Sequence, residues 1–316
     1  MSSSCLLTRG SNLQDDQSNM IDSHQHVFWH GQDDAGLISD MNKCGILTAW
    51  LLGWEIAPWE DAVRFAGALN PVHMRANGTH PGIPLEDLIL ARKNFPGRFE
   101  IGFCPHPMIG YPVARLEAAV KMFGIRVCGE WKFRMPFDDP RCIELFHAAG
   151  RLKLPVILHL DVPYLKGGAG IPVYQPNWYG GTVENLSRAL ATCPETIFVG
   201  HAPGFWREIS ADADDAPEVY PTGPVIPGGK LESLLATYPN LYADLSAGSA
   251  LKALQRDLAY TRHFLIRFAD KLLFGRDYYG DELQCFLQSL DLPKNVLHNL
   301  TVGNAVRLVP LDNTQS

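Results

Sequence analysis

The sequence lacks any long apolar run, although 46% of its 316 residues are hydrophobic. No segment approaches the roughly 20 apolar residues that a helix needs to span a bilayer, so no membrane anchor is expected. Basic residues are also in deficit, with 27 Lys and Arg against 34 Asp and Glu and a net charge of -7. This balance argues against a nucleic acid or an anionic membrane as partner. We therefore expect the partner to be a small-molecule substrate.

Closely spaced cysteines are also missing. The seven cysteines stand singly, without zinc-finger or Cys-x-x-Cys spacing, at positions 5, 44, 104, 128, 142, 193 and 285. Residues 1–19 are polar and contain no apolar core of signal-peptide length. Together these features predict free thiols in a reducing, cytoplasmic compartment. We expect residues 1–19 to be a disordered extension and residues 20–312 to form the folded unit.

Short apolar runs alternate with segments of helical periodicity along the rest of the chain. The runs occupy residues 21–27, 46–53, 99–104, 126–133, 155–160, 196–200, 241–245 and 271–274. Apolar positions such as Leu145, Phe146 and Ala149 follow a helical spacing between two of these runs. This alternation predicts an α/β fold in which helices cover a parallel sheet. Eight such units favour a closed (β/α)8 TIM barrel in a single domain.

Two connections are too long to be simple turns. Residues 163–181 follow the fifth run, and residues 202–229 follow the sixth. Both begin at the carboxyl ends of predicted strands, the face on which barrels build their active sites. Both also carry bulky aromatic residues, so we interpret them as loops that wall a pocket.

The residues with the clearest chemistry are two histidines one residue apart, His24 and His26, in the first apolar run. Strand side chains alternate between faces, so both imidazoles point the same way and suit a divalent metal of the zinc type. His159, His201 and Asp277 stand at the ends of the fifth, sixth and eighth runs. In a barrel those ends surround one axis, so all five side chains can meet on one ion.

At these positions the sequence resembles the amidohydrolase superfamily, and most closely its amidohydrolase-related branch. That branch includes lactone hydrolases as well as aminocarboxymuconate-semialdehyde and resorcylate decarboxylases. The resemblance rests on the segments around His24 and His26, His159, His201 and Asp277, and on the closing Gly-Asn-Ala-Val-Arg segment at 303–307. It implies a (β/α)8 barrel in which His24, His26, His159 and Asp277 bind a divalent metal, with zinc expected. His201 would then be an acid/base or an additional ligand.

The fourth run departs from the simplest pattern with one metal ion, because strand parity places Glu130, Lys132 and Arg134 on one face. Glu130 occupies the place where some amidohydrolases carry a bridging carboxylated lysine. One interpretation makes Glu130 a metal ligand that completes a second site with His159 and His201, with Lys132 as an alternative for that role. The other makes these residues a salt-bridged layer below the metal.

The expected chemistry is activation of water, which a zinc ion makes acidic near neutral pH. Asp277 would accept the water's proton and pass it to the leaving group, while His201 would polarise the attacked carbonyl.

Several further residues are candidates for substrate binding. Lys132 and Arg134 would hold a carboxylate, and Asp161 would bind a hydroxyl or amine. Trp206 would cover the pocket. Arg207 and Arg276 are weaker candidates for binding the substrate.

The leading hypothesis is metal-dependent hydrolysis of a lactone, ester or amide. The alternative uses the same site to remove carbon dioxide from an unsaturated or aromatic acid. Related decarboxylases often carry proline soon after the equivalent of Asp277, whereas Tyr278, Tyr279 and Gly280 follow here, which favours hydrolysis. A third hypothesis is a barrel that has lost catalysis and only binds. Barrels of this group often dimerise, so a homodimer is an open expectation.

Overall fold

The computed structural model describes residues 19–60 and 67–311. The predicted extension, residues 1–19, lies outside the described residues except for Asn19, and so does residue 312. Within these limits no helix combines the length and the apolar character that a membrane span requires.

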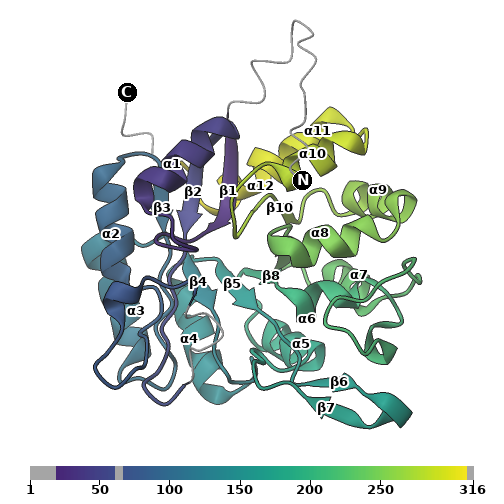
Figure 1. Cartoon of the computed structure of the whole chain (residues 1–316), viewed down its shortest axis with the longest axis horizontal. Helices are drawn as coiled ribbons and strands as arrows, with labels where there is room; N and C mark the ends of the chain where they lie inside the picture. Colours follow the sequence, from purple (N-terminus) through teal and green to yellow (C-terminus); the bar gives the residue numbers. More distant parts are fainter. Residues whose placement is uncertain (1–18, 61–66, 312–316) are drawn as a thin grey trace, which may run out of the picture.

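Eight parallel strands form the centre of the molecule (Figure 1). They are β1 (Met20–Gln25), β2 (Ile46–Leu51), β3 (Phe99–Ile101), β4 (Cys128–Trp131), β5 (Val156–His159), β8 (Phe198–His201), β9 (Leu241–Asp244) and β10 (Leu272–Leu273). Each coincides with one of the eight predicted apolar runs, although most of the strands are shorter than the runs. Strand pairing gives two arcs, β1-β2-β3 and β10-β9-β8-β5-β4.

Hydrogen bonds between the ends of the two arcs close the barrel. Gly102 and Val127 form a parallel bridge that joins β3 to β4. On the other side the amide of Ser23 donates to the carbonyl of Phe274 at 2.9 Å, which joins β1 to β10. The sheet therefore has no free edge, and the predicted (β/α)8 barrel is confirmed.

Helices pack around this cylinder (Figure 1). They are α1 (Asp34–Lys43), α2 (Leu85–Asn94), α3 (Pro112–Phe123), α4 (Pro140–Arg151), α5 (Val183–Thr192), α7 (Lys230–Thr237), α8 (Ala247–Gln255), α9 (Leu258–Arg267), α10 (Glu282–Ser289), α11 (Lys294–His298) and α12 (Asn304–Leu308). Helix α4 shows the local cause of such an element. The Asp139 carboxylate accepts from the Arg141 amide at the N-cap, and the apolar face including Leu145 and Phe146 is fully buried.

Two buried clusters fill the structure. One lies between strands and helices. The other takes residues from β1, β2, β5, β8 and β10, against which Ala305 of α12 and Val309 pack. Apolar residues thus occupy both faces of the strands, which explains why the runs are continuously hydrophobic rather than alternating.

The two long connections contain short elements of their own. Residues 163–181 hold an antiparallel hairpin of β6 (Tyr164–Lys166) and β7 (Pro172–Tyr174), which projects from the barrel (Figure 1, bottom). Residues 202–229 hold α6 (Pro203–Trp206) and the 3-10 turns η4 (Arg207–Ile209) and η5 (Ala213–Asp215).

Candidate metal centre

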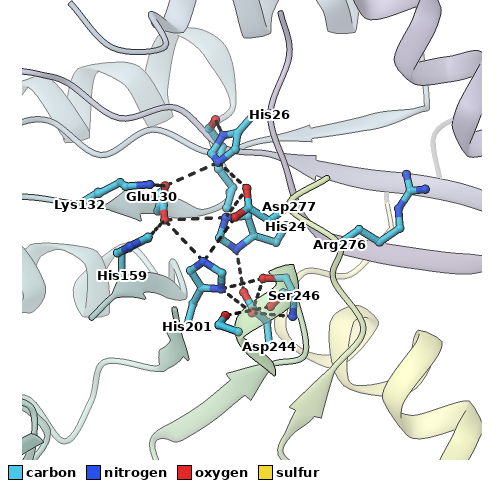
Figure 2. A network of polar contacts seen from close by, with 12 residues as sticks. His24, His26, Glu130, Lys132, His159, His201, Asp244, Ser246, Arg276 and Asp277 are labelled. Carbon is cyan, nitrogen blue, oxygen red and sulfur yellow. Dashed lines mark hydrogen bonds and ion pairs between the residues drawn. The ribbon is translucent and has the colours of Figure 1, made fainter. Parts of the chain in front are cut away.

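His24 of β1 and His26, just after β1, point to the same side, as strand alternation predicts, and Asp277 approaches them from the segment after β10 (Figure 2). The Oδ1 atom of Asp277 lies 3.3 Å from His26 Nε2 and 3.9 Å from His24 Nε2. Asp277 has a φ of 51°, in the left-handed region that few residues other than glycine adopt. Its amide donates to the carbonyl of His24 at 2.8 Å, which fixes this turn against β1.

Hydrogen bonds at Nδ1 leave Nε2 of both histidines available to a ligand. His26 Nδ1 lies 2.7 Å from the carbonyl oxygen of Leu52. A carbonyl can only accept, so Nδ1 carries the proton and Nε2 keeps its lone pair. His24 Nδ1 lies 2.8 Å from a carboxylate oxygen of Asp244, which has the same effect. Nitrogen lone pairs held in this way are suited to a metal ion.

Three buried atoms at this centre have no hydrogen-bond partner within residues 19–60 and 67–311. They are His24 Nε2, Glu130 Oε2 and Asp277 Oδ1. Buried polar atoms are normally paired, because an unpaired one loses its interactions with water without compensation. A nitrogen lone pair and carboxylate oxygens without hydrogen bonds are the kinds of donor that a divalent cation binds. The residues present therefore fit a metal ion.

Glu130 of β4 stands between this group and two further histidines. Its Oε1 atom lies 2.6 Å from His159 Nδ1 and 4.0 Å from His201 Nε2, and its Oε2 atom lies 3.6 Å from His26 Nε2. The possible ligand atoms accordingly fall into one group of His24, His26 and Asp277 and another of Glu130, His159 and His201. The resemblance placed His159 with the first group, and one interpretation of Glu130 placed it with Glu130 and His201; its ring lies beside Glu130.

Asp244 of β9 contacts two imidazoles at once. Its Oδ2 atom lies 2.8 Å from His24 Nδ1, and its Oδ1 atom lies 3.0 Å from His201 Nδ1. The Ser246 hydroxyl lies 2.7 Å from the same nitrogen of His201. Asp244 is fully buried, so it positions one histidine from each group rather than contacting a substrate.

Neighbouring basic groups keep the carboxylates at the centre ionised. Burial would raise the pKa of Asp277, but the imidazoles of His24 and His26 hold it below its usual range. Burial acts likewise on Glu130, where Lys132 and His159 outweigh it and keep the pKa low. His201 and His24 do the same for the pKa of Asp244. The carboxylates are therefore ionised at neutral pH, as metal ligands must be.

The predicted substrate residues lie at different distances from this centre. Lys132 is buried, with its Nζ atom 3.6 Å from Glu130 Oε2 and 4.7 Å from the ring centre of Trp54. Asp161 contacts His159 Nε2 at 3.1 Å. Arg134 is half-buried and lies 3.4 Å from the Asn177 side chain. Lys132 and Asp161 thus adjoin the centre, whereas Arg134 stands further out.

The structure contradicts the expectation that Trp206 covers the pocket. Trp206 is fully buried, and its indole Nε1 donates to the Asp244 carbonyl at 3.0 Å. The cause is α6, a single turn that directs this side chain inward against Phe264. Trp206 therefore stabilises the strand end that carries Asp244.

Arg276 is also no substrate residue in this arrangement, and Figure 2 shows it pointing away from the cluster. Its Nε donates to Asp22 at 2.7 Å and its Nη1 to Asp40 at 2.6 Å. No role was predicted for Asp22 from the sequence, although it lies two residues before His24. Its oxygens also accept from the backbone amides of His24 and Arg276, so it ties β1 to the segment that carries Asp277.

Two aromatic residues beside the centre, Trp29 and Trp54, were also missed, whereas Tyr179 belongs to the connection whose aromatic residues were expected to wall a pocket. Trp29 and Trp54 lie with ring centres 5.2 and 5.4 Å from that of His26, and Tyr179 lies 5.4 Å from that of His159. Nothing in the local spacing of these residues distinguishes them from core aromatics.

No family model matches this sequence, and no curated protein matches it in sequence. Solved structures do match in three dimensions. An uncharacterised TIM-barrel protein from Bordetella bronchiseptica is 16% identical, with a TM-score of 0.60 over 92% of this chain and 98% of the other. The fold is that of a TIM barrel.

Two further matches are named as enzymes. A 5-carboxyvanillate decarboxylase from Sphingomonas paucimobilis is 14% identical, with a TM-score of 0.59 over 93% of this chain and all of the other (100%). A candidate 2-pyrone-4,6-dicarboxylic acid hydrolase from Pseudomonas putida is 16% identical, with a TM-score of 0.56 over 92% and 97% of the two chains. At identities this low, the matches establish only the shared barrel fold. The matched structures include one named as a decarboxylase and one named as a hydrolase.

Proposed function

We propose that the protein is a metal-dependent hydrolase that cleaves a lactone, ester or amide bond of a small molecule. The observation that carries the proposal is a set of buried atoms without a hydrogen-bond partner among the described residues: His24 Nε2 and Asp277 Oδ1 in the first group, and Glu130 Oε2 in the adjoining one. His24, His26 and Asp277 would hold one divalent cation, with zinc expected from their nitrogen and oxygen ligands. When bound, such an ion supplies Lewis-acid polarisation and makes water a stronger acid.

Asp277 is the residue we propose as the base. Its side chain is 15% exposed, against 1% or less for His24, His26, Glu130 and His201, so it is the most open of these groups to water and substrate. Its ionised carboxylate can accept a proton from the attacking water and return it to the leaving group.

His201 has two possible roles that exclude each other. As a ligand, His201 would bind a metal ion together with Glu130 and His159, and it needs a lone pair on Nε2 to do so. As an acid it needs a proton on Nε2, and Asp244 beside Nδ1 would stabilise the resulting imidazolium. The number of ions bound per chain decides between the roles: one ion leaves His201 as the acid, and two ions make it a ligand.

The alternative function is non-oxidative decarboxylation, and the similarity to the fold of the 5-carboxyvanillate decarboxylase supports it. Hydrolysis is preferred because Tyr278, Tyr279 and Gly280 follow Asp277 where decarboxylases often carry proline. The predicted domain limits, homodimer and cytoplasmic location remain predictions.

The test combines metal analysis with two assays. Elemental analysis of protein purified without added metal should find one or two divalent ions per chain. A lactone and ester panel followed by base titration should show turnover, and a carboxylic acid panel followed by carbon dioxide release should not. Replacement of His26 by alanine should lose activity and metal together, whereas replacement of His147, a half-exposed histidine of α4, should lose neither. An active, metal-replete His26→Ala protein would contradict the proposal, and carbon dioxide release without hydrolysis would favour the alternative.

A His201→Gln variant separates the two roles of that residue. If His201 is the acid, the variant should keep the metal content of the wild type and lose turnover. If it is a ligand, the variant should lose one ion per chain.

A further inference from the structure

A cavity of about 200 Å³ lies between the two long connections, beside the metal centre. Its walls come from the residues after β5, the turn after the hairpin, and the segment after β8. The lining residues are Asp161, Val162, Gln175, Pro176, Asn177, Gly204, Arg207 and Val219. Asp161 contacts His159 at 3.1 Å, so the cavity shares a wall with the proposed active site.

Arg207 is the cationic side chain in this lining, and it is only 5% exposed. Its Nη2 atom donates to the carbonyls of Ala213 and Ala216, while its Nε atom is buried and has no hydrogen-bond partner in the part of the chain that the structure describes. Carbonyl oxygens accept hydrogen bonds but carry no net charge, so they leave the guanidinium charge uncompensated.

Arg276 shows how a buried arginine is otherwise accommodated in this protein. It is equally buried, and two carboxylates, Asp22 and Asp40, lie within 2.7 Å of it. No carboxylate of the described residues lies within 4 Å of Arg207. Burial lowers the pKa of Arg207 despite the more distant charges of Glu208, Asp214, Glu218 and Asp212. A buried cation without a close counter-ion is costly unless a ligand supplies the anion.

We propose that Arg207 and the Asn177 amide bind a carboxylate group of the substrate in this cavity. The proposal rests on the proposed function for calling that ligand a substrate. Asn177 Oδ1 accepts a hydrogen bond from Arg134, so the NH2 group of Asn177 is the donor that we propose for the ligand. The Asp161 carboxylate in the same wall would repel a phosphate dianion more strongly than a singly charged carboxylate. The oxygens of Asp161 can accept a hydrogen bond from a substrate hydroxyl.

The geometry therefore assigns the substrate to the carboxylate-bearing class. Arginine forms paired, charge-assisted hydrogen bonds to a carboxylate, and such bonds are stronger when water is excluded. This anchor lies on the β8 side of the mouth, whereas the sequence had placed it at Lys132 and Arg134 on the β4 side.

Equilibrium binding of butyrate and butyramide to chelator-treated, metal-free protein tests the proposal. The two probes have nearly the same shape and differ in charge. We expect butyrate to bind about tenfold or more tightly than butyramide, the size of one charge-assisted contact. Arg207→Met should lose this preference, Arg207→Lys should keep part of it, and Arg188→Met, an exposed arginine of α5, should keep all of it.

Two outcomes would overturn the proposal: an unchanged butyrate preference in Arg207→Met, or loss of that preference in Lys132→Met. Because Arg207 also holds two loop carbonyls, Val219→Trp provides a second variant that fills the cavity from another wall. It should weaken the binding of both probes, and unaltered butyrate binding there would also refute the proposal. Since no metal or turnover is involved, failure here is distinguishable from failure of the hydrolase proposal.

Discussion

Asp244 shows how one buried carboxylate can organise a site that it does not enter. It accepts from Nδ1 of both His24 and His201, and Ser246 and Trp206 hold it in turn. Each contact fixes which ring nitrogen carries the proton, and so which one is presented to the centre. The two proposed groups of ligand atoms are therefore oriented by a single residue.

Replacement of this carboxylate should weaken metal binding without removing any ligand. In Asp244→Asn an NH2 group replaces one carboxylate oxygen and faces the protonated Nδ1 of His24 or His201. Two donors then oppose each other, so that imidazole must change tautomer or rotate. Loss of such a supporting contact typically lowers metal affinity about 10- to 100-fold, and we expect a decrease of that size. Competition with a chromophoric chelator measures it.

The matched control is Asp257→Asn, which alters the N-cap of α9 far from the site. Asparagine caps helices about as well as aspartate, so this variant should keep the metal affinity of the wild type. Equal metal affinities in Asp244→Asn and the wild type would show that Asp244 does not orient these ligands.

At the scale of elements, the segment after β8 is a series of short turns rather than one loop. Burial of α6 and η4 places Trp206, Arg207 and Glu208 inside the protein, three residues that a surface loop would leave in water. The length and the aromatic residues of 202–229 predicted a connection that walls a pocket, and Gly204, Arg207 and Val219 do line a cavity. It could not show which side chains turn inward, because a single helical turn has too few residues for a periodic pattern.

Glu208 of η4 should make stability depend on pH. Burial raises its pKa from 4.5 to about 7 in the folded protein, despite Lys230 at 4.0 Å. The folded state therefore holds this proton more tightly than the unfolded state. The resulting stabilisation is present below about pH 4.5 and is lost as the pH rises to about 7.

Glu208→Gln should abolish that dependence. Relative to the wild type its free energy of unfolding should increase between pH 4.5 and pH 8, by up to roughly 3 kcal/mol. Urea unfolding of both proteins at several pH values measures the difference. The control is Glu184→Gln, an exposed carboxylate near the same lysine. A constant difference between Glu208→Gln and wild type across this range would contradict the prediction.

For the whole molecule, closure of the barrel brings the first and last strands together and creates the centre. Arg276 and Asp22 join β1 to the segment after β10, beside His24 and Asp277. The proposed ligands therefore come from residues more than 250 positions apart, and their geometry exists only in the closed fold. Metal binding should accordingly stabilise the folded state and not the unfolded chain.

Removal of divalent metal should lower the melting temperature. At a free metal concentration 100-fold above the dissociation constant, binding contributes about 2.7 kcal/mol, which corresponds to about 5 °C for a domain of this size. Scanning calorimetry before and after chelation, with elemental analysis of each sample, measures the change. Adding zinc should restore the wild-type value, and it should have a smaller effect on Asp244→Asn. Identical melting temperatures in metal-replete and metal-free protein would contradict a site that needs a cation for its buried carboxylates.

The sequence by itself determined the number and order of the strands and the position of the histidines at their ends. Both follow from local rules, since a buried parallel strand must be apolar along its length and its carboxyl end faces the barrel mouth. Only the tertiary structure decided that His159 lies beside Glu130, that Trp206 turns inward, and that Arg207 rather than Arg276 faces a cavity. Those outcomes depend on which distant side chains compensate a buried charge, and chain periodicity carries no information about them.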